Sequence, residues 1–107
     1  MSNLKLKFQP RSFGEAFATL AGRKELQIGD NTRLVQDGDE IYATYHGNRI
    51  VRYGQHEVAV SFAGWATVTT ANRINKLSRA AAQIRKGEPV INGQTLSDWE
   101  AWVSEQA

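Results

Sequence analysis

Short turn signals separate the β-prone segments of this chain, and their spacing constrains the fold more than any other feature. Asp37-Gly38 lies between segments 32–36 and 40–46, Gly47-Asn48 precedes segment 49–53, and Gly54-Gln55 precedes segment 56–62. Gly paired with Asp or Asn favours tight hairpins. A parallel crossover needs about a dozen residues or more, so links this short force neighbouring strands to run antiparallel. The sequence therefore predicts an antiparallel β-meander, which residues 26–28 begin.

The hydrophobic period changes from two to 3.6 after residue 64. The apolar residues Ile74, Leu77, Ala81 and Ile84 share one side of a helical wheel. This pattern predicts a central helix over residues 70–86, with Thr69 or Thr70 as its N-cap and Gly87 after its last turn.

Both ends of the chain also carry signals of secondary structure. Alternation over residues 4–8 predicts a short edge strand, and Ser12 with Glu15 has the spacing of a capping box, which predicts a helix over 13–21. An apolar stripe of Leu96, Trp99 and Val103 predicts a last helix. The expected fold is one α+β domain over residues 1–107. In it a meander of four to five strands packs against the central helix, with flanking N- and C-terminal helices.

Several classes of protein are excluded or disfavoured by what the 107 residues lack. The chain has no cysteine, which excludes disulfides, Fe–S clusters and a thiol nucleophile. His46 and His56 are isolated, and His46 with Asp37 or Asp39 is the best acid–base pair on offer. We therefore expect no metal, no cofactor and no enzymatic activity. The chain has no long apolar run and no signal-peptide pattern, so the default location is cytoplasmic.

Charge is distributed unevenly along the second half of the chain. Residues 71–86 hold five basic and no acidic side chains, whereas residues 87–107 hold four acidic and no basic ones. On the predicted helix, Lys76, Arg79 and Lys86 lie away from the apolar stripe. This basic face either binds an anionic partner or is covered by the acidic tail.

The segment that leads into the central helix concentrates hydrogen-bond donors. Thr67, Thr69, Thr70 and Arg73 lie at a strand-to-helix junction, where free backbone N–H groups can hold an anion. The functional interpretation is a phosphate contact. The structural one, slightly favoured, is a capped helix whose Arg73 pairs with an acid of the sheet. Trp65 is predicted to close the core rather than to stack on a base.

Other aromatic residues extend the candidate surface. Tyr42 alternates with Ile41 and Ala43, so it is expected to face outward beside Arg49 and Arg52. That face either binds nucleic acid or is a solvated sheet surface. Near the C-terminus, Trp99 is predicted to be in the core and Trp102 to be half exposed.

The run Gly-Trp-x-Thr-Val-Thr-Thr-x-x-Arg-Ile-Asn, from Gly64 to Asn75, resembles the hallmark of a family of small phage-encoded proteins of unassigned function. Upstream, segments 28–34 and 41–51 are similar to further elements of that family. The resemblance spans about residues 26–77. It departs from the family at Ala63, where relatives often have glycine, and at Ala66, where they often carry a basic residue. The resemblance implies a phage context and action inside an infected bacterium.

Three functions follow as hypotheses. The first is a non-enzymatic phage accessory protein that binds nucleic acid, or a host complex containing it, through the basic helix. The second is a protein-binding inhibitor of a host defence system, similar in role to an anti-CRISPR. The third is a small phosphohydrolase, or a nucleotide- or phosphate-binding protein, that uses Arg73 and His46.

Overall fold

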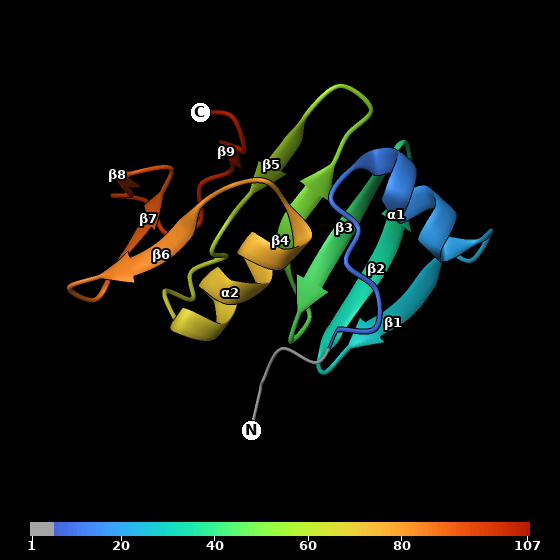
Figure 1. Ribbon diagram of the computed structural model, residues 1–107, viewed down its shortest axis with the longest axis horizontal. Coiled ribbons are helices and arrows are strands. Elements are labelled where there is room, and N and C mark those ends of the chain that lie inside the picture. The colour runs from blue at the N-terminus through green and yellow to red at the C-terminus, as the bar shows by residue number, and fades with distance from the viewer. Residues whose placement is uncertain (1–5) are drawn as a thin grey trace.

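The computed structural model describes residues 6–107 and places two helices on one face of a six-stranded antiparallel sheet (Figure 1). The strand order of this sheet is β1-β2-β3-β4-β5-β9. Its strands are β1 (Glu25–Gly29), β2 (Thr32–Asp37), β3 (Glu40–Tyr45), β4 (Asn48–Tyr53), β5 (Val58–Val60) and β9 (Val103–Ser104). The predicted meander is therefore confirmed, with the C-terminal segment adding a further edge strand.

The hairpin turns lie where the sequence predicts them. Asp37 pairs with Glu40, and Tyr45 pairs with Asn48, so both loops have two residues. His46 and Gly47 have φ values of 53° and 81°, the left-handed conformation that a type I′ turn requires at both positions. Glycine adopts this conformation without strain, which explains the turn signal at residue 47.

The first helix, α1 (Phe13–Leu20), confirms the predicted helix over 13–21. The Ser12 hydroxyl caps it by accepting from the Glu15 N–H at 3.1 Å, and the Glu15 carboxylate accepts from the Arg11 N–H at 2.8 Å. The predicted strand over 4–8 falls partly outside the described residues. Within them, Leu6 makes an isolated antiparallel bridge to Gly29.

The second helix, α2 (Val68–Leu77), is shorter than the predicted helix over 70–86. Its end is fixed by side chains that bond the backbone: Ser78 Oγ donates to the Ile74 carbonyl, and the Asn75 amide bonds both backbone groups of Ala82. Residues 82–91 then form a hairpin of β6 (Ala82–Arg85) and β7 (Glu88–Ile91). Lys86 and Gly87 form its turn, both with positive φ.

The predicted C-terminal helix is wrong. After β8 (Gln94–Thr95), which completes a small second sheet with β6 and β7, the chain runs without helix to β9. Backbone bonds tie this segment to β5, because Val103 pairs with Val60 and Glu105 N–H donates to the Val58 carbonyl. Trp99 is 40% exposed, so its predicted place in the core is also wrong, whereas Trp102, 36% exposed, is half exposed as predicted.

The main core lies between the large sheet and the two helices. Its buried members come from both layers, among them Leu20, Leu34, Ile41, Val51, Phe62, Ile74 and Leu77. Neither helix of the described residues is long and apolar enough to cross a membrane.

Candidate functional site

The threonines at the start of α2 form a connected cluster of hydroxyl groups. Thr67, rather than the predicted Thr69 or Thr70, is the N-cap, because its Oγ1 accepts from the Thr70 N–H at 3.2 Å. The same Oγ1 lies 3.2 Å from Thr69 Oγ1 and 2.9 Å from Thr70 Oγ1. Thr67 is exposed, Thr69 is half-buried and Thr70 is buried, so two of the three predicted contact residues remain accessible.

A cleft of about 330 Å³ opens beside this cluster, and we call it the threonine–tryptophan cleft. It lies between the β3–β4 turn, the end of β5 and the start of α2. The residues that line it are Tyr45, His46, Asn48, Ile50, Phe62, Trp65, Thr67, Thr69 and Thr70.

Trp65 is 58% exposed on this cleft, so its predicted place in the core is wrong. Phe62, fully buried, fills the core position at the end of β5 instead. Ala63 and Gly64 then turn the chain through two left-handed residues, which carries Trp65 out to the surface. A sequence reading that counts tryptophan as core cannot detect this turn, because alanine rarely adopts a positive φ.

Arg73 is buried, at 1% exposure, and the predicted direct contact with an exposed phosphate is wrong for this conformation. Its Nε donates to Thr32 Oγ1 at 2.8 Å and its Nη2 donates to the Asp30 carbonyl at 3.1 Å. The predicted pairing with an acid of the sheet is also wrong, because a hydroxyl and a carbonyl fill that role. Nη1 has no hydrogen-bond partner among residues 6–107.

The guanidinium of Arg73 also lies over the Tyr45 ring, 4.3 Å from its centroid. Tyr45 lines the threonine–tryptophan cleft and also an adjoining cavity of about 330 Å³, whose other lining residues are Gln27, Asp30, Asn31 and Arg73. Tyr45 therefore separates two hollows at this end of the sheet.

The opposite side of the sheet carries the predicted cluster of Tyr42, Arg49 and Arg52, joined by Trp102. Arg49 lies over the Tyr42 ring at 4.1 Å, and Arg52 lies over the Trp102 ring at 5.0 Å. Carboxylates compensate both cations: Arg49 pairs with Asp37 at 3.0 Å and Arg52 with Glu40 at 3.9 Å. Burial, with a hydrogen bond donated to Glu40, raises the pKa of Tyr42. This face is aromatic and close to neutral rather than cationic.

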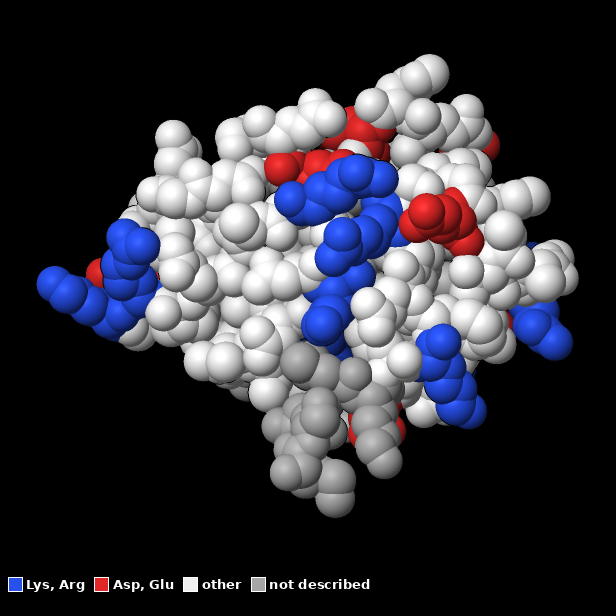
Figure 2. Space-filling view, viewed as in Figure 1, with Lys and Arg blue, Asp and Glu red and all other residues white. Residues whose placement is uncertain are grey.

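Exposed cations gather instead on the helix side. Figure 2 shows a column of basic side chains near the middle of that face, with acidic side chains above it and to one side. Arg11 donates from Nε and Nη2 to the carbonyls of Lys76 and Asn75, which brings it onto the end of α2, and Arg79 follows two residues after that helix. We call Arg11, Lys76 and Arg79 the cation column. In the described part of the chain none of the three makes an ion pair.

Lys86 does not belong to the cation column, because it lies in the β6–β7 turn rather than on α2. The acidic tail reaches the column at one point, where the Glu105 carboxylate accepts from the backbone N–H of Arg79 at 2.8 Å. Over residues 6–107, no ion pair joins the basic segment 71–86 to the acidic tail.

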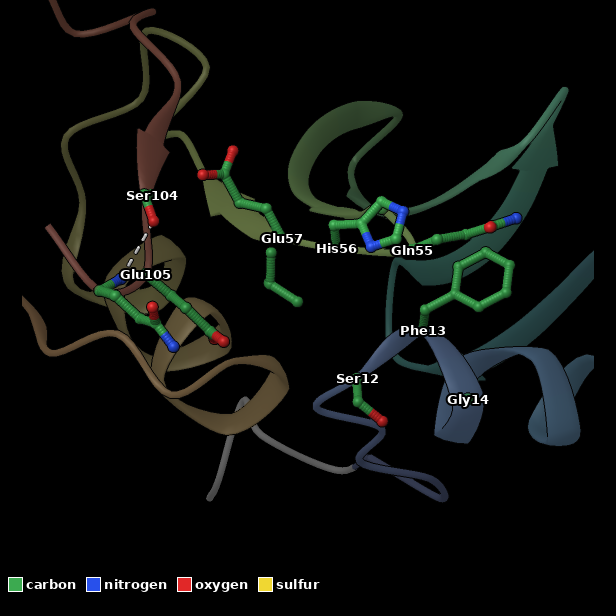
Figure 3. Close-up of a pocket in the computed structure, with 11 residues that line it drawn as sticks. Ser12, Phe13, Gly14, Gln55, His56, Glu57, Ser104 and Glu105 are labelled. Carbon is green, nitrogen blue, oxygen red and sulfur yellow. Dashed lines mark hydrogen bonds between the residues drawn. The ribbon is translucent and has the colours of Figure 1, made fainter.

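His46 and His56 lie in two different turns of the large sheet, between β3 and β4 and between β4 and β5. Asp37 and Asp39 lie at the turn at one end of β3, whereas His46 follows its other end, so the acid–base pair considered for His46 does not form. His56 lines a cavity of about 500 Å³ between the start of α1, the β4–β5 turn and the C-terminal segment (Figure 3). The carboxylate of Glu57 points away from the His56 ring there. No group of three potential metal ligands lies within residues 6–107.

Sequence reasoning missed two residues that shape these surfaces. Arg11 lies far from α2 in sequence, and no periodic pattern links them. Tyr45 directly precedes the His46-Gly47 turn, which the sequence does indicate. Nothing in that turn or in the downstream motif indicates that Tyr45 contacts Arg73.

The sequence model of one family, described as Kyanoviridae Gp96 protein, matches residues 11–106. No curated protein shows significant similarity to the chain, and no solved structure does.

Proposed function

We propose that this chain, which belongs to the Kyanoviridae Gp96 family of phage proteins, is a non-enzymatic accessory protein that binds nucleic acid inside the infected bacterial cell. The observation that carries the proposal is the cation column. Arg11, Lys76 and Arg79 are exposed, come from two segments far apart in sequence, and make no ion pair in the described structure.

Unpaired surface cations suit a phosphate backbone because each contact releases condensed counterions. The arginines of the sheet are less suited to this role, since Arg33, Arg49 and Arg52 each lie next to a carboxylate. The binding surface thus differs from the one predicted along a long basic helix. The proposed surface retains Lys76 and Arg79 from that prediction and adds Arg11. It excludes Lys86, which lies in the β6–β7 turn.

The test measures the affinity of a labelled DNA oligonucleotide for the parent and for the double variant Lys76→Gln/Arg79→Gln, over a series of salt concentrations. The expected result is weaker binding at low salt and a slope of log K against log salt that is flatter by up to about two units. The matched control is Arg85→Gln/Lys86→Gln, which removes the same charge at the β6–β7 turn. Equal losses in both variants would show that net charge, not the column, governs binding.

The sheet face supports a second candidate, a protein-binding inhibitor of a host defence system. Aromatic residues and arginine are enriched at protein interfaces, and Tyr42, Trp102, Arg49 and Arg52 form one network there. The variant Trp102→Ala distinguishes the two functions. It should abolish capture of a host protein from nuclease-treated lysate and leave DNA affinity unchanged.

A further inference from the structure

The threonine–tryptophan cleft has the construction of a site for a small planar group. Its volume, about 330 Å³, is at the lower end of the range for ligand sites. Ile50 and Phe62 line it although both are at most 1% exposed, so buried core residues close its base. Trp65 and Tyr45 add aromatic surface from two different elements.

The charge and polarity of the nine lining residues restrict the class of ligand that the cleft can bind. None of the nine lining residues is Lys, Arg, Asp or Glu, so a phosphate would find no compensating side chain other than His46. Thr67, Thr69 and Asn48 offer hydrogen-bond groups that both donate and accept. A neutral, planar group with polar edges fits this lining, and a nucleobase has those properties.

Trp65 provides the second, independent observation. A tryptophan that is 58% exposed in a small domain leaves a large aromatic face in water, next to a cavity that could receive a partner ring. Base–aromatic stacking is tolerant of sequence because every base has a π-face.

We infer that the threonine–tryptophan cleft binds one unpaired nucleobase of a single-stranded nucleic acid, which stacks on Trp65 and bonds the threonine hydroxyls. The inference rests on the function proposed above and specifies the form of the partner. A base inside a duplex is stacked on both faces and paired at one edge, so it cannot enter the cleft without being extruded at a cost.

The cavity on the other side of Tyr45 offers space for the nucleotide that follows the bound base in the nucleic-acid strand. Arg73 lines that cavity and has in Nη1 a donor without a partner over the described range.

The experiment compares labelled oligothymidine with a DNA duplex of equal length at low salt. The parent and Trp65→Ala are measured, with Phe17→Ala as the matched control, because Phe17 is a similarly exposed aromatic residue on α1 outside the cleft. The expected result is that Trp65→Ala weakens single-strand binding roughly 10-fold or more and leaves duplex binding unchanged. Phe17→Ala should change neither affinity.

An unchanged single-strand affinity in Trp65→Ala would overturn the inference and leave the cation column as a nucleic-acid surface. If the parent binds neither DNA form, the proposed function fails, and free thymidine then tests the cleft alone by NMR. Shifts confined to the Trp65 indole and the Thr67 and Thr69 amides would support a base site. The absence of shifts at thymidine concentrations of several millimolar would overturn it.

Discussion

Arg73 lies beneath Tyr45, with its guanidinium carbon 4.3 Å from the ring centroid. The cation is 1% exposed, and its other contacts are the Thr32 hydroxyl and the Asp30 carbonyl, both at the β1–β2 turn. One side chain of α2 thereby ties the first hairpin of the sheet to the ring that forms a wall of the threonine–tryptophan cleft. A buried cation without a carboxylate partner is costly, so this arrangement is stable only because hydrogen bonds and the aromatic face offset its desolvation.

Replacing Arg73 tests that linkage. Arg73→Ala leaves the Thr32 hydroxyl oxygen without its donor, removes one of the two donors to the Asp30 carbonyl and opens a cavity, so the free energy of unfolding should fall by about 3 kcal/mol or more. Arg73→Lys retains the charge but not the planar fork, and we expect a smaller loss of about 1–2 kcal/mol. Urea denaturation followed by fluorescence measures both. An Arg73→Ala protein as stable as the parent would show that the buried contacts contribute nothing.

Trp65→Ala has a different expected outcome from the one its residue type suggests. A buried tryptophan truncated to alanine costs about 3–5 kcal/mol, but Trp65 is 58% exposed, so we expect a loss of at most about 1 kcal/mol. Thermal unfolding by circular dichroism checks this. A sharp fall in melting temperature would place Trp65 among the core residues and would contradict the exposed position.

The meander could be predicted from sequence because its information is local. The β2–β3 and β3–β4 hairpins each have a two-residue loop with glycine at a left-handed position, and alternation within the strands sets the register. The first helix was predictable for the same reason, since Ser12 and Glu15 mark its start within one turn.

The predictions failed where contacts distant in sequence decide the structure. Ala81 and Ile84 continue the helical period of Ile74 and Leu77, yet Ala82 and Ile84 also fit a strand, and pairing with β7 together with the Asn75 amide selects the strand. The burial of Arg73 depends likewise on Thr32 and Tyr45, and no spacing within the motif reveals those partners.

Because of Tyr53, the stability of the folded protein should fall at alkaline pH. Burial raises the pKa of its phenol, with smaller contributions from Glu105 and Glu15, and the O–H lies 2.9 Å from the Pro10 carbonyl and 2.7 Å from that of Leu77. Above the ordinary tyrosine pKa of about 10 the unfolded chain ionises at Tyr53 while the folded chain does not. Stability that is complete below about pH 10 should therefore be lost as the pH rises, by up to about 1.4 kcal/mol per unit.

The control for this pH dependence is Tyr53→Phe. At pH 7 it should be less stable by about 1 kcal/mol, because two carbonyls lose a shared donor. Its urea midpoint should fall less steeply than that of the parent between about pH 10 and 11.5. Parallel losses in the two proteins would assign the alkaline transition to other groups.

Asn92 holds the C-terminal segment in place through side-chain hydrogen bonds, and a substitution of almost identical shape tests this role. Its Oδ1 accepts from the Ala81 N–H, and its Nδ2 donates to the carbonyls of Glu105 and Ala107 at 2.9 and 2.8 Å. Asn92→Asp retains the acceptor and removes both donors, which should lower the local opening free energy by about 2 kcal/mol.

The Glu105 amide reports this opening, because its N–H donates to the Val58 carbonyl across the edge of the sheet. Hydrogen exchange at Glu105 should accelerate by about 10- to 30-fold in Asn92→Asp, while amides in β2 and β3 keep the parent rate.

Asn72→Asp, the same change on α2 away from the C-terminal segment, is the control. If exchange at Glu105 is equal in all three proteins, pairing with β5 alone holds the segment. If only Asn92→Asp accelerates it, the small second sheet anchors the sixth strand of the large one, because Asn92 directly follows β7.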